Sequence, residues 1–297
     1  MKPVRAQQGR RQIRPRLAWP YLFVLPFIPI FLIFTVYPIV FTAQLSLTSW
    51  HGSGAALWVG LENYRYLLTN PDFWGSLVNS AWLWVLIIPV QMALAVLAAV
   101  LLNMADLSGR GIYRVIFIIP YVTPLVAIAQ IWTVLFDSGH GAVNAALGLV
   151  GLPEVGWLTT VPWAKPTLAL LFLWKSTGFV IIILLSGLQS IDPDIYEAAA
   201  IDGAGSLRRL VSITIPLLRP TLAFALVMQT LGVFQMFAEP FVMTQGGPYR
   251  STTTAGYYLY NHITRGDLGT GAANSLLLVI VVMAVSLVFV RLLRGKE

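Results

Sequence analysis

The sequence contains no cysteine, and only 10% of its 297 residues carry a charged side chain. The absence of cysteine excludes a disulfide framework, a thiolate metal site and a cysteine nucleophile. The shortage of charge excludes an ordinary water-soluble domain, in which about a quarter of the residues are charged. Apolar residues instead make up 57% of the chain, and its mean hydropathy is +0.76. This composition predicts a membrane protein.

Six stretches are long and apolar enough to cross a bilayer, whose hydrocarbon core of ~30 Å needs about 20 helical residues. We predict spans at about 19–45, 81–102, 115–136, 168–188, 220–238 and 272–290. Pro120 and Pro124 predict kinks in the third span. The fold class is therefore an all-α polytopic membrane protein with six transmembrane helices, and a short surface helix is predicted at 61–68 in the first outer loop.

Lysine and arginine are distributed unevenly over the predicted loops. When both termini are placed in the cytoplasm, fourteen of the 19 lie on the inner side, four lie outside, and Lys175 lies within a span. Cytoplasmic loops carry such an excess, so the net charge of +7 indicates orientation, and no nucleic-acid partner is needed to explain it. We expect a basic cytoplasmic segment at 1–18, a six-helix domain over 19–291 surrounded by membrane lipid, and a cytoplasmic tail at 292–297.

The inner loop at about 190–219 carries the strongest local signals. Asp192 can cap a helix that begins at Pro193. The alanines at 198–200 favour that helix and keep its surface narrow, and Gly203 allows the chain to turn after it. A helix of this kind can dock into a groove on a partner protein, or it can be an interfacial helix that only links two spans. The residues alone leave both interpretations open.

This loop resembles the EAA motif of permease subunits of binding-protein-dependent ABC importers, which is written E-A-A-x3-G-x9-I-x-L-P. The matching residues are Glu197, Ala198, Ala199, Gly203, Ile213, Ile215 and Pro216, with isoleucine at 215 in place of leucine. The likeness extends over about residues 20–295 and is to the carbohydrate-uptake branch, which includes maltose-type and glycerol-phosphate-type permeases. Shorter matching pieces lie at 61–64, 101–103, 109–114, 174–179 and 244–248.

The resemblance implies the type I ABC importer permease fold, in which the EAA helix inserts into a cleft on a cytoplasmic ATPase. It assigns this coupling to Glu197, Ala198, Ala199 and Gly203, with Asp202, Arg208 and Arg209 as ionic contacts or as solvated charges. It further implies a second permease, more often a related subunit than an identical one, two ATPase subunits or domains, and an extracytoplasmic solute-binding protein. ATP and Mg would be used by the ATPase, because no lysine of this chain stands in a Walker A loop. We expect this chain to be non-catalytic and to bind no cofactor or metal.

Polar side chains at membrane depth usually face a cavity or a partner. We therefore consider five residues as candidates for the solute pathway, namely Lys175, Gln229, Phe234, Gln235 and Glu239. Gln235 and Glu239 would share one face of a continuous helix, because they are four residues apart. A structural pair at Lys175, or hydrogen bonds between helices, would produce the same pattern.

These observations predict a permease subunit in the cytoplasmic membrane of a prokaryote, which moves a sugar, oligosaccharide or sugar derivative by alternating access. Permeases for glycerol phosphate, phosphodiesters or another small solute stay open as alternatives. An ion-coupled secondary carrier is less favoured, because it would be expected to show buried acidic residues and an internal repeat, and we find neither in the sequence.

Overall fold

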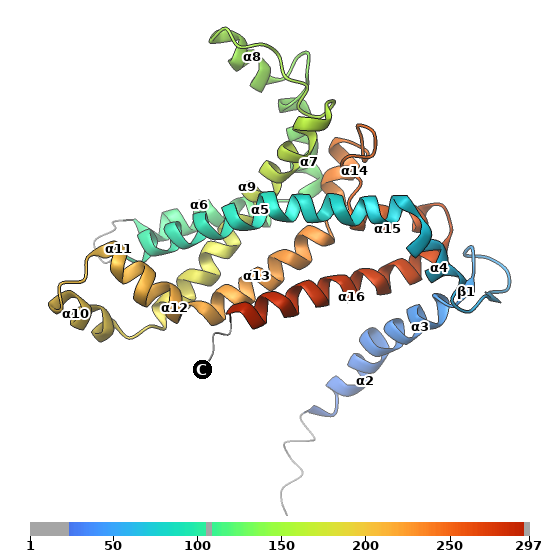
Figure 1. Cartoon of the computed structure of the whole chain (residues 1–297), viewed down its shortest axis with the longest axis horizontal. Helices are drawn as coiled ribbons and strands as arrows, with labels where there is room; N and C mark the ends of the chain where they lie inside the picture. The colour runs from blue at the N-terminus through green and yellow to red at the C-terminus, as the bar shows by residue number, and fades with distance from the viewer. Residues whose placement is uncertain (1–23, 105–108, 294–297) are drawn as a thin grey trace, which may run out of the picture.

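The structure, a computed structural model, describes residues 24–104 and 109–293. The predicted segment 1–18 and most of the tail 292–297 lie outside the described residues. The chain is built almost entirely of helices, whose long members lie alongside one another (Figure 1). In chain order the elements are α2 (Phe27–Phe31), the π-helical η1 (Leu32–Val36), α3 (Tyr37–Leu45), β1 (Thr48–Ser49), β2 (Leu57–Trp58), α4 (Glu62–Thr69), α5 (Pro71–Asn103), α6 (Arg110–Val122), α7 (Leu125–Leu135), α8 (Ala142–Leu149), α9 (Val161–Gln189), α10 (Pro193–Ile201), α11 (Ser206–Arg209), the π-helical η2 (Leu210–Thr214), α12 (Ile215–Leu217), α13 (Arg219–Phe234), α14 (Ala238–Met243), α15 (Ala255–Thr264) and α16 (Leu268–Leu293).

Within this described part of the chain, five helical segments are long and apolar enough to cross a membrane, and a sixth results if α6 and α7 form one bent span. The prediction of an all-helical polytopic membrane protein is therefore confirmed. We call the end of the bundle that carries α10 to α12 the inner end, and the end that carries β1, β2 and α4 the outer end (Figure 1). Helix α16 packs against α13 and runs toward the inner end, where its last residues lie (Figure 1).

The centre of the bundle is the packing of α5 against α9 and α13. Two apolar clusters fill it, and their fully enclosed members include Leu83, Ile87, Leu168 and Leu184. Small side chains let the helices approach closely, as at Ala95 and Ala99 of α5, which are both 0% exposed. Lipid is as apolar as leucine, so close van der Waals packing between helices holds such a bundle together.

The third span is not the single helix that the sequence predicts. Helices α6 and α7 meet at an angle of 91°, with Thr123 in extended conformation and Pro124 outside helical geometry between them. Proline disfavours helical geometry at the residue before it and has no N–H to donate, so the chain leaves the helix at Thr123. The prolines predict a kink, but the right-angled turn is larger than a kink. It sends α7 sideways from the bundle, and α8 follows it outward (Figure 1).

The fifth span is also interrupted, so Gln235 and Glu239 do not lie on one continuous helix as expected. Helix α13 ends at Phe234, and α14 begins at Ala238. Pro240 explains the break, because it cannot donate to the carbonyl of Met236 and its ring would collide with that group. The hydroxyl of Thr254 donates to the Met236 carbonyl instead. The start of α15 therefore satisfies the backbone that the proline leaves open.

The crossing of α6 and α9 depends on Gly178. A Cβ atom at this position would collide with the backbone carbonyl of Phe117. We expect Gly178→Ala to lower the free energy of unfolding by about 1–3 kcal/mol, because the two helices would have to separate. The measurement is the thermal unfolding midpoint of the purified subunit in detergent. Gly111→Ala on α6 is the control, since a Cβ there meets nothing within 4 Å; equal midpoints for the two variants would contradict this account of the crossing.

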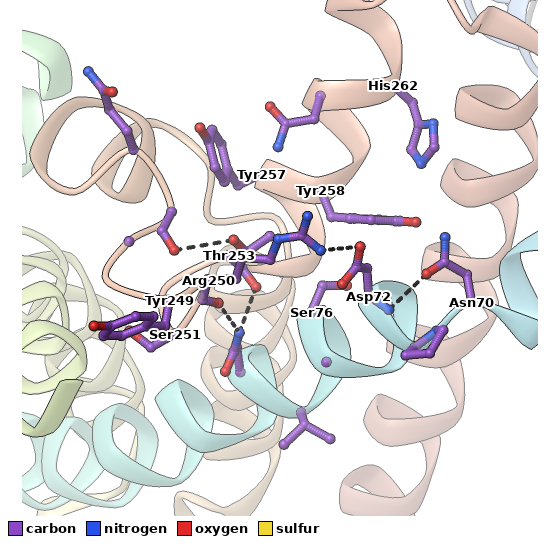
Figure 2. A pocket seen from close by; sticks show the side chains of 18 of the residues that line it. Asn70, Asp72, Ser76, Tyr249, Arg250, Ser251, Thr253, Tyr257, Tyr258 and His262 are labelled. Carbon is purple, nitrogen blue, oxygen red and sulfur yellow. Dashed lines mark hydrogen bonds and ion pairs between the residues drawn. The ribbon is translucent and has the colours of Figure 1, made fainter.

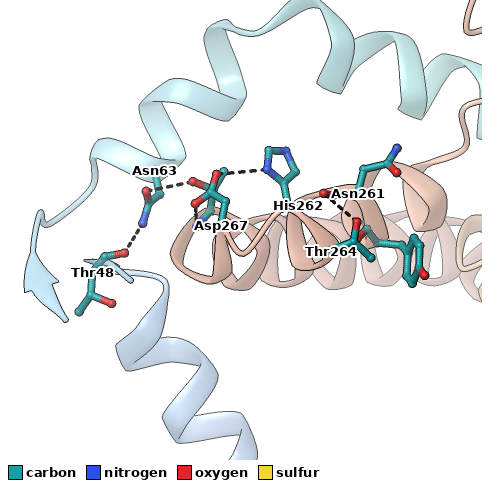
Figure 3. Close-up of polar contacts among 8 residues, drawn as sticks. Thr48, Asn63, Asn261, His262, Thr264 and Asp267 are labelled. Carbon is teal, nitrogen blue, oxygen red and sulfur yellow. Dashed lines mark hydrogen bonds and ion pairs between the residues drawn. The ribbon is translucent and has the colours of Figure 1, made fainter. Parts of the chain in front are cut away.

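The outer end is tied together by a polar network around Asn63 (Figure 3). The Asn63 amide donates to the carbonyls of Ser46 and Thr48 at 2.8 and 2.9 Å, and its oxygen accepts from the Thr270 hydroxyl at 3.3 Å. His262 of α15 lies 3.3 Å from the carboxylate of Asp267, which precedes α16. These contacts join α4, the β1 region and the start of α16, and α4 itself confirms the surface helix predicted at 61–68.

Candidate functional site

The inner loop forms the helix that its sequence predicts. The side chain of Asp192 accepts a hydrogen bond from the backbone N–H of Asp194 at 3.0 Å, which caps α10. After α10 the chain turns at Gly203, whose φ is +76°, and the N–H of Ala204 donates to the carbonyl of Ala199 at 2.9 Å. Helices commonly end with a residue in the left-handed conformation, followed by a backbone hydrogen bond back into the last turn, and glycine is the usual residue at this left-handed position.

The EAA residues are displayed on the surface of this chain. Glu197, Ala198, Asp202, Gly203 and Arg208 are exposed, whereas Ala199 and Arg209 are half-buried. A hydrogen bond between the hydroxyl groups of Tyr196 and Thr214, at 3.1 Å, joins α10 to η2. Figure 1 shows α10 and α11 standing at the inner end, beyond the end of α5. The predicted coupling residues are therefore available to a partner.

Sequence reasoning missed the apolar part of this surface. Ile201 is 87% exposed, Leu207 is 73% exposed, and Val211 is 56% exposed. Ile201 and Leu207 flank the Gly203 turn, so a partner that covers the turn would also cover them. The sequence does contain a signal for this surface: Ile201 and Leu207 are large apolar residues on either side of a predicted glycine turn, in a loop between two spans. Covering such apolar side chains with a partner is favourable, because it removes apolar surface from water.

A cavity of about 350 Å³ lies among α6, α9, α13 and α14. It brings together four of the five predicted pathway residues, namely Lys175, Gln229, Gln235 and Glu239. Tyr121, Phe172 and Phe179 add aromatic rings to its wall. We call it the pathway cavity. Phe234 does not line it, because Phe234 packs with Ala255, Leu278 and Val282 in an apolar cluster on another side of α13.

Lys175 links the pathway cavity to the bend between α6 and α7. Its ammonium group donates to the backbone carbonyl of Tyr121 at 2.9 Å and lies 5.2 Å from the centre of the Tyr121 ring. That ring stacks on Phe179 at 4.4 Å. The bend leaves the last carbonyls of α6 without helical donors, and a cation at a helix C-terminus is favourable. Lys175 thus stabilises the bend and places its charge in the cavity.

A buried polar cluster supports the same cavity from behind. The amide of Gln91 donates to the hydroxyl of Ser176 at 2.7 Å and to the side-chain oxygen of Gln229 at 3.4 Å. These residues come from α5, α9 and α13, and all three side chains are buried. Each polar side chain is costly in an apolar medium unless it is paired, so the cluster fixes the three helices relative to one another. The structure adds Ser176, Tyr121 and Phe179 to the residues that sequence reasoning singled out.

An exposed helix at the inner end and a polar cavity between bent membrane helices are features expected of a transport permease. The chain belongs to the family described as binding-protein-dependent transport system inner membrane component, which matches residues 91–295. It is thus the permease subunit of an ABC importer, a non-catalytic translocation component of the inner membrane, and the resemblance seen in the sequence is confirmed. Membership implies a partner ATPase.

Known relatives cover almost the whole chain. The trehalose/maltose transport system permease protein MalF of Thermococcus litoralis is 34% identical over 93% of this chain and 94% of that protein. The lactose transport system permease protein LacF of Rhizobium radiobacter is 36% identical over 93% of this chain and 94% of that protein. Among solved structures, a bacterial ABC transporter involved in the import of the acidic polysaccharide alginate matches with a TM-score of 0.79 and 25% identity, over 94% of this chain and 97% of that one. The fold is therefore that of type I ABC importer permeases.

Proposed function

We propose that this permease imports a sugar, an oligosaccharide or a sugar derivative through the pathway cavity. The observation that carries the proposal is the composition of that cavity, which Gln235, Lys175 and Glu239 line together with aromatic residues. Amides and carboxylates can pair with several hydroxyl groups at once, and aromatic rings cover the apolar faces of sugar rings. Relatives that carry maltose, trehalose and lactose support this assignment.

The coupling residues transmit motion of the ATPase to the membrane helices, because both ends of α10 are connected to them. Residues 190–192 connect α10 directly to α9, and α11, η2 and α12 connect it to α13. Helices α9 and α13 carry Lys175 and Gln229, so a shift of α10 moves both walls of the pathway cavity. In this account Glu197, Ala198, Ala199 and Gly203 contact the ATPase, and Asp202, Arg208 and Arg209 supply ionic contacts.

The proposed assembly contains a second, related permease, two ATPase subunits or domains that use ATP and Mg, and an extracytoplasmic solute-binding protein. This arrangement needs the coupling loop in the cytoplasm, as the distribution of lysine and arginine also favours. Both termini then lie in the cytoplasm. Alternating access follows when ATP binding draws the ATPase units together and moves the two permeases against each other.

An anionic solute such as a glycerol phosphodiester is the second candidate. Lys175 favours it, because its ammonium group lines the pathway cavity and could pair with a phosphate. The carboxylate of Glu239 in the same cavity opposes this, and neutral sugars are therefore preferred.

The test is a binding screen on the cognate solute-binding protein, followed by uptake into proteoliposomes that contain the complete importer. We expect the receptor to bind a sugar or oligosaccharide and uptake of that solute to require ATP. A receptor that binds only amino acids or peptides would contradict the substrate class. Uptake driven by an ion gradient without ATP would contradict the mechanism.

A further inference from the structure

A second and larger cavity lies at the outer end, between the start of α5, the loop 244–254 and α15 (Figure 2). Its volume is about 740 Å³, within the range of sites that bind small molecules. It shares no lining residue with the pathway cavity. The prominent polar side chains on its wall are Asn70, Asp72, Tyr257, Tyr258, Asn261 and Arg265. We call it the outer cavity.

The loop on one side of the outer cavity is held in an unusual conformation. Gln245, Tyr249 and Arg250 all have positive φ angles, of 50°, 49° and 60°. Such angles cost non-glycine residues roughly 1–2 kcal/mol each. Arg250 forms an ion pair with Asp72 of α5, and the Asn79 amide donates to the carbonyls of Arg250 and Thr253, each at 3.0 Å (Figure 2). The surrounding contacts thus fix a strained loop as one wall of the cavity, a pattern typical of binding sites.

The opposite wall combines aromatic rings with hydrogen-bonding groups. Tyr257 and Tyr258 are 9% and 8% exposed, and Figure 2 shows them beside Arg250. Burial raises the pKa of Tyr258 to about 12, so its hydroxyl group stays protonated and can donate. Asn70 and Asn261 add amides, which both donate and accept hydrogen bonds. Rigid tyrosines next to adaptable amides suit a ligand that has both apolar ring faces and many hydroxyl groups.

We propose that the outer cavity is a second carbohydrate-contact site, which holds a sugar unit of the incoming solute at the outer end before it enters the pathway cavity. The inference rests on the proposed sugar import. Tyr257 and Tyr258 supply ring surface, while Asn261 and Asp72 bond to hydroxyl groups. The strained loop keeps the site formed in the absence of the solute.

The first experiment fills the outer cavity from Gly75. This glycine lines the cavity, and a Cβ added to it meets nothing within 4 Å, so Gly75→Phe can enter the space without a backbone clash. Gly148→Phe on α8 is the matched control, because a Cβ there also meets nothing within 4 Å and the residue lies outside the cavity. We expect Gly75→Phe to raise the KM for uptake about tenfold or more, as loss of a few hydrogen bonds would, and Gly148→Phe to leave it unchanged.

A second measurement distinguishes a sugar site from a docking surface for the solute-binding protein, which is the receptor. It is the receptor concentration that gives half-maximal ATPase activity of the importer. We expect Gly75→Phe to leave this concentration unchanged. An increase in it would overturn the proposal and assign the outer cavity to receptor docking. An unchanged KM for uptake in Gly75→Phe would also overturn it.

Direct binding is measured by thiol protection, because the chain has no cysteine of its own. Asn261→Cys would place one thiol on the cavity wall, and Leu149→Cys would place one on α8, where the side chain is 90% exposed. The probes are maltotriose and an alginate trisaccharide, added to the complete importer without its receptor. We expect at least one probe to slow alkylation of the Asn261→Cys variant only, and Gly75→Phe to abolish this protection. Equal alkylation with and without both probes would overturn the proposal, whereas a receptor that binds no sugar would instead contradict the proposed function.

Discussion

Gly203→Val is expected to reduce ATP-driven uptake about tenfold or more while the subunit still inserts into the membrane and remains folded. Coupling between distant sites is usually worth about 1–3 kcal/mol, so a displaced coupling helix has an effect of this size. The φ of Gly203 is +76°, and valine disfavours this conformation, so the turn after α10 would shift. Within this chain a Cβ at Gly203 meets nothing within 4 Å, so the valine side chain causes no clash inside the subunit. Its effects are then strain in the turn and a clash with the partner.

Gly151→Val is the matched control for this prediction. Gly151 also has a positive φ, of 74°, and a Cβ there meets nothing within 4 Å, but it lies in the loop after α8. Both variants bear the same backbone strain, and only Gly203 belongs to the predicted ATPase contact. The measurements are uptake into proteoliposomes and the amount of ATPase that co-purifies. Equal uptake by the two variants would show that the EAA loop does not transmit the motion.

Lys175→Met is expected to destabilise the subunit, and adding Glu239→Gln is expected to restore part of the lost stability without restoring uptake. The single change leaves the Tyr121 carbonyl without its donor, at a cost of about 1–3 kcal/mol, and removes a positive charge from the cavity that holds the buried Glu239. A charge in a largely apolar cavity is costly without a compensating partner, so neutralising Glu239 as well removes that part of the loss, whereas the Tyr121 carbonyl stays without its donor. Thermal unfolding of the purified importer measures these differences.

Uptake by the double variant separates a structural role from a role in transport. If Lys175 and Glu239 contact the solute, the folded double variant should transport it about tenfold more slowly or worse, since lost hydrogen bonds to charged groups are worth about 1.5–3 kcal/mol. Leu170→Met on the same helix, at a position 47% exposed, is the control and should behave like the unchanged protein. Full transport by the double variant would show that neither residue contacts the solute.

The parts of the fold that local signals determine were predicted well. The cap at Asp192, the helix through the alanines and the turn at Gly203 follow from short-range preferences, and α10 has all three. The helical membrane fold follows equally from composition and long apolar stretches. Interactions between neighbours in sequence decide these features, so a single sequence contains enough information for them.

The helix breaks and the cavities depend on contacts between residues that are distant in the sequence, and such contacts could not be predicted from one sequence. Pro124 predicts a kink, but the donor that stabilises the 91° turn is Lys175, 54 residues from the Tyr121 carbonyl that it satisfies. The interruption near Pro240 likewise depends on Thr254, which lies on the next element. Gln235 and Glu239 are predicted to share one face of a continuous helix, and they line the same cavity although the helix is interrupted between them. Phe234 packs against residues of α15 and α16, and these contacts between distant helices cannot be read from the sequence near Phe234.

The most direct test of the central claim, that α10 inserts into the ATPase, is a cross-link from Ile201 in the complete importer. Ile201 is 87% exposed beside the Gly203 turn, and the chain has no native cysteine to interfere with an Ile201→Cys variant. With a short thiol-reactive cross-linker, we expect this variant to join the ATPase subunit in high yield, whereas Leu149→Cys on α8 should not. If Ile201→Cys gave no ATPase product while the intact importer hydrolysed ATP and took up its solute, the coupling role assigned to this loop would be wrong.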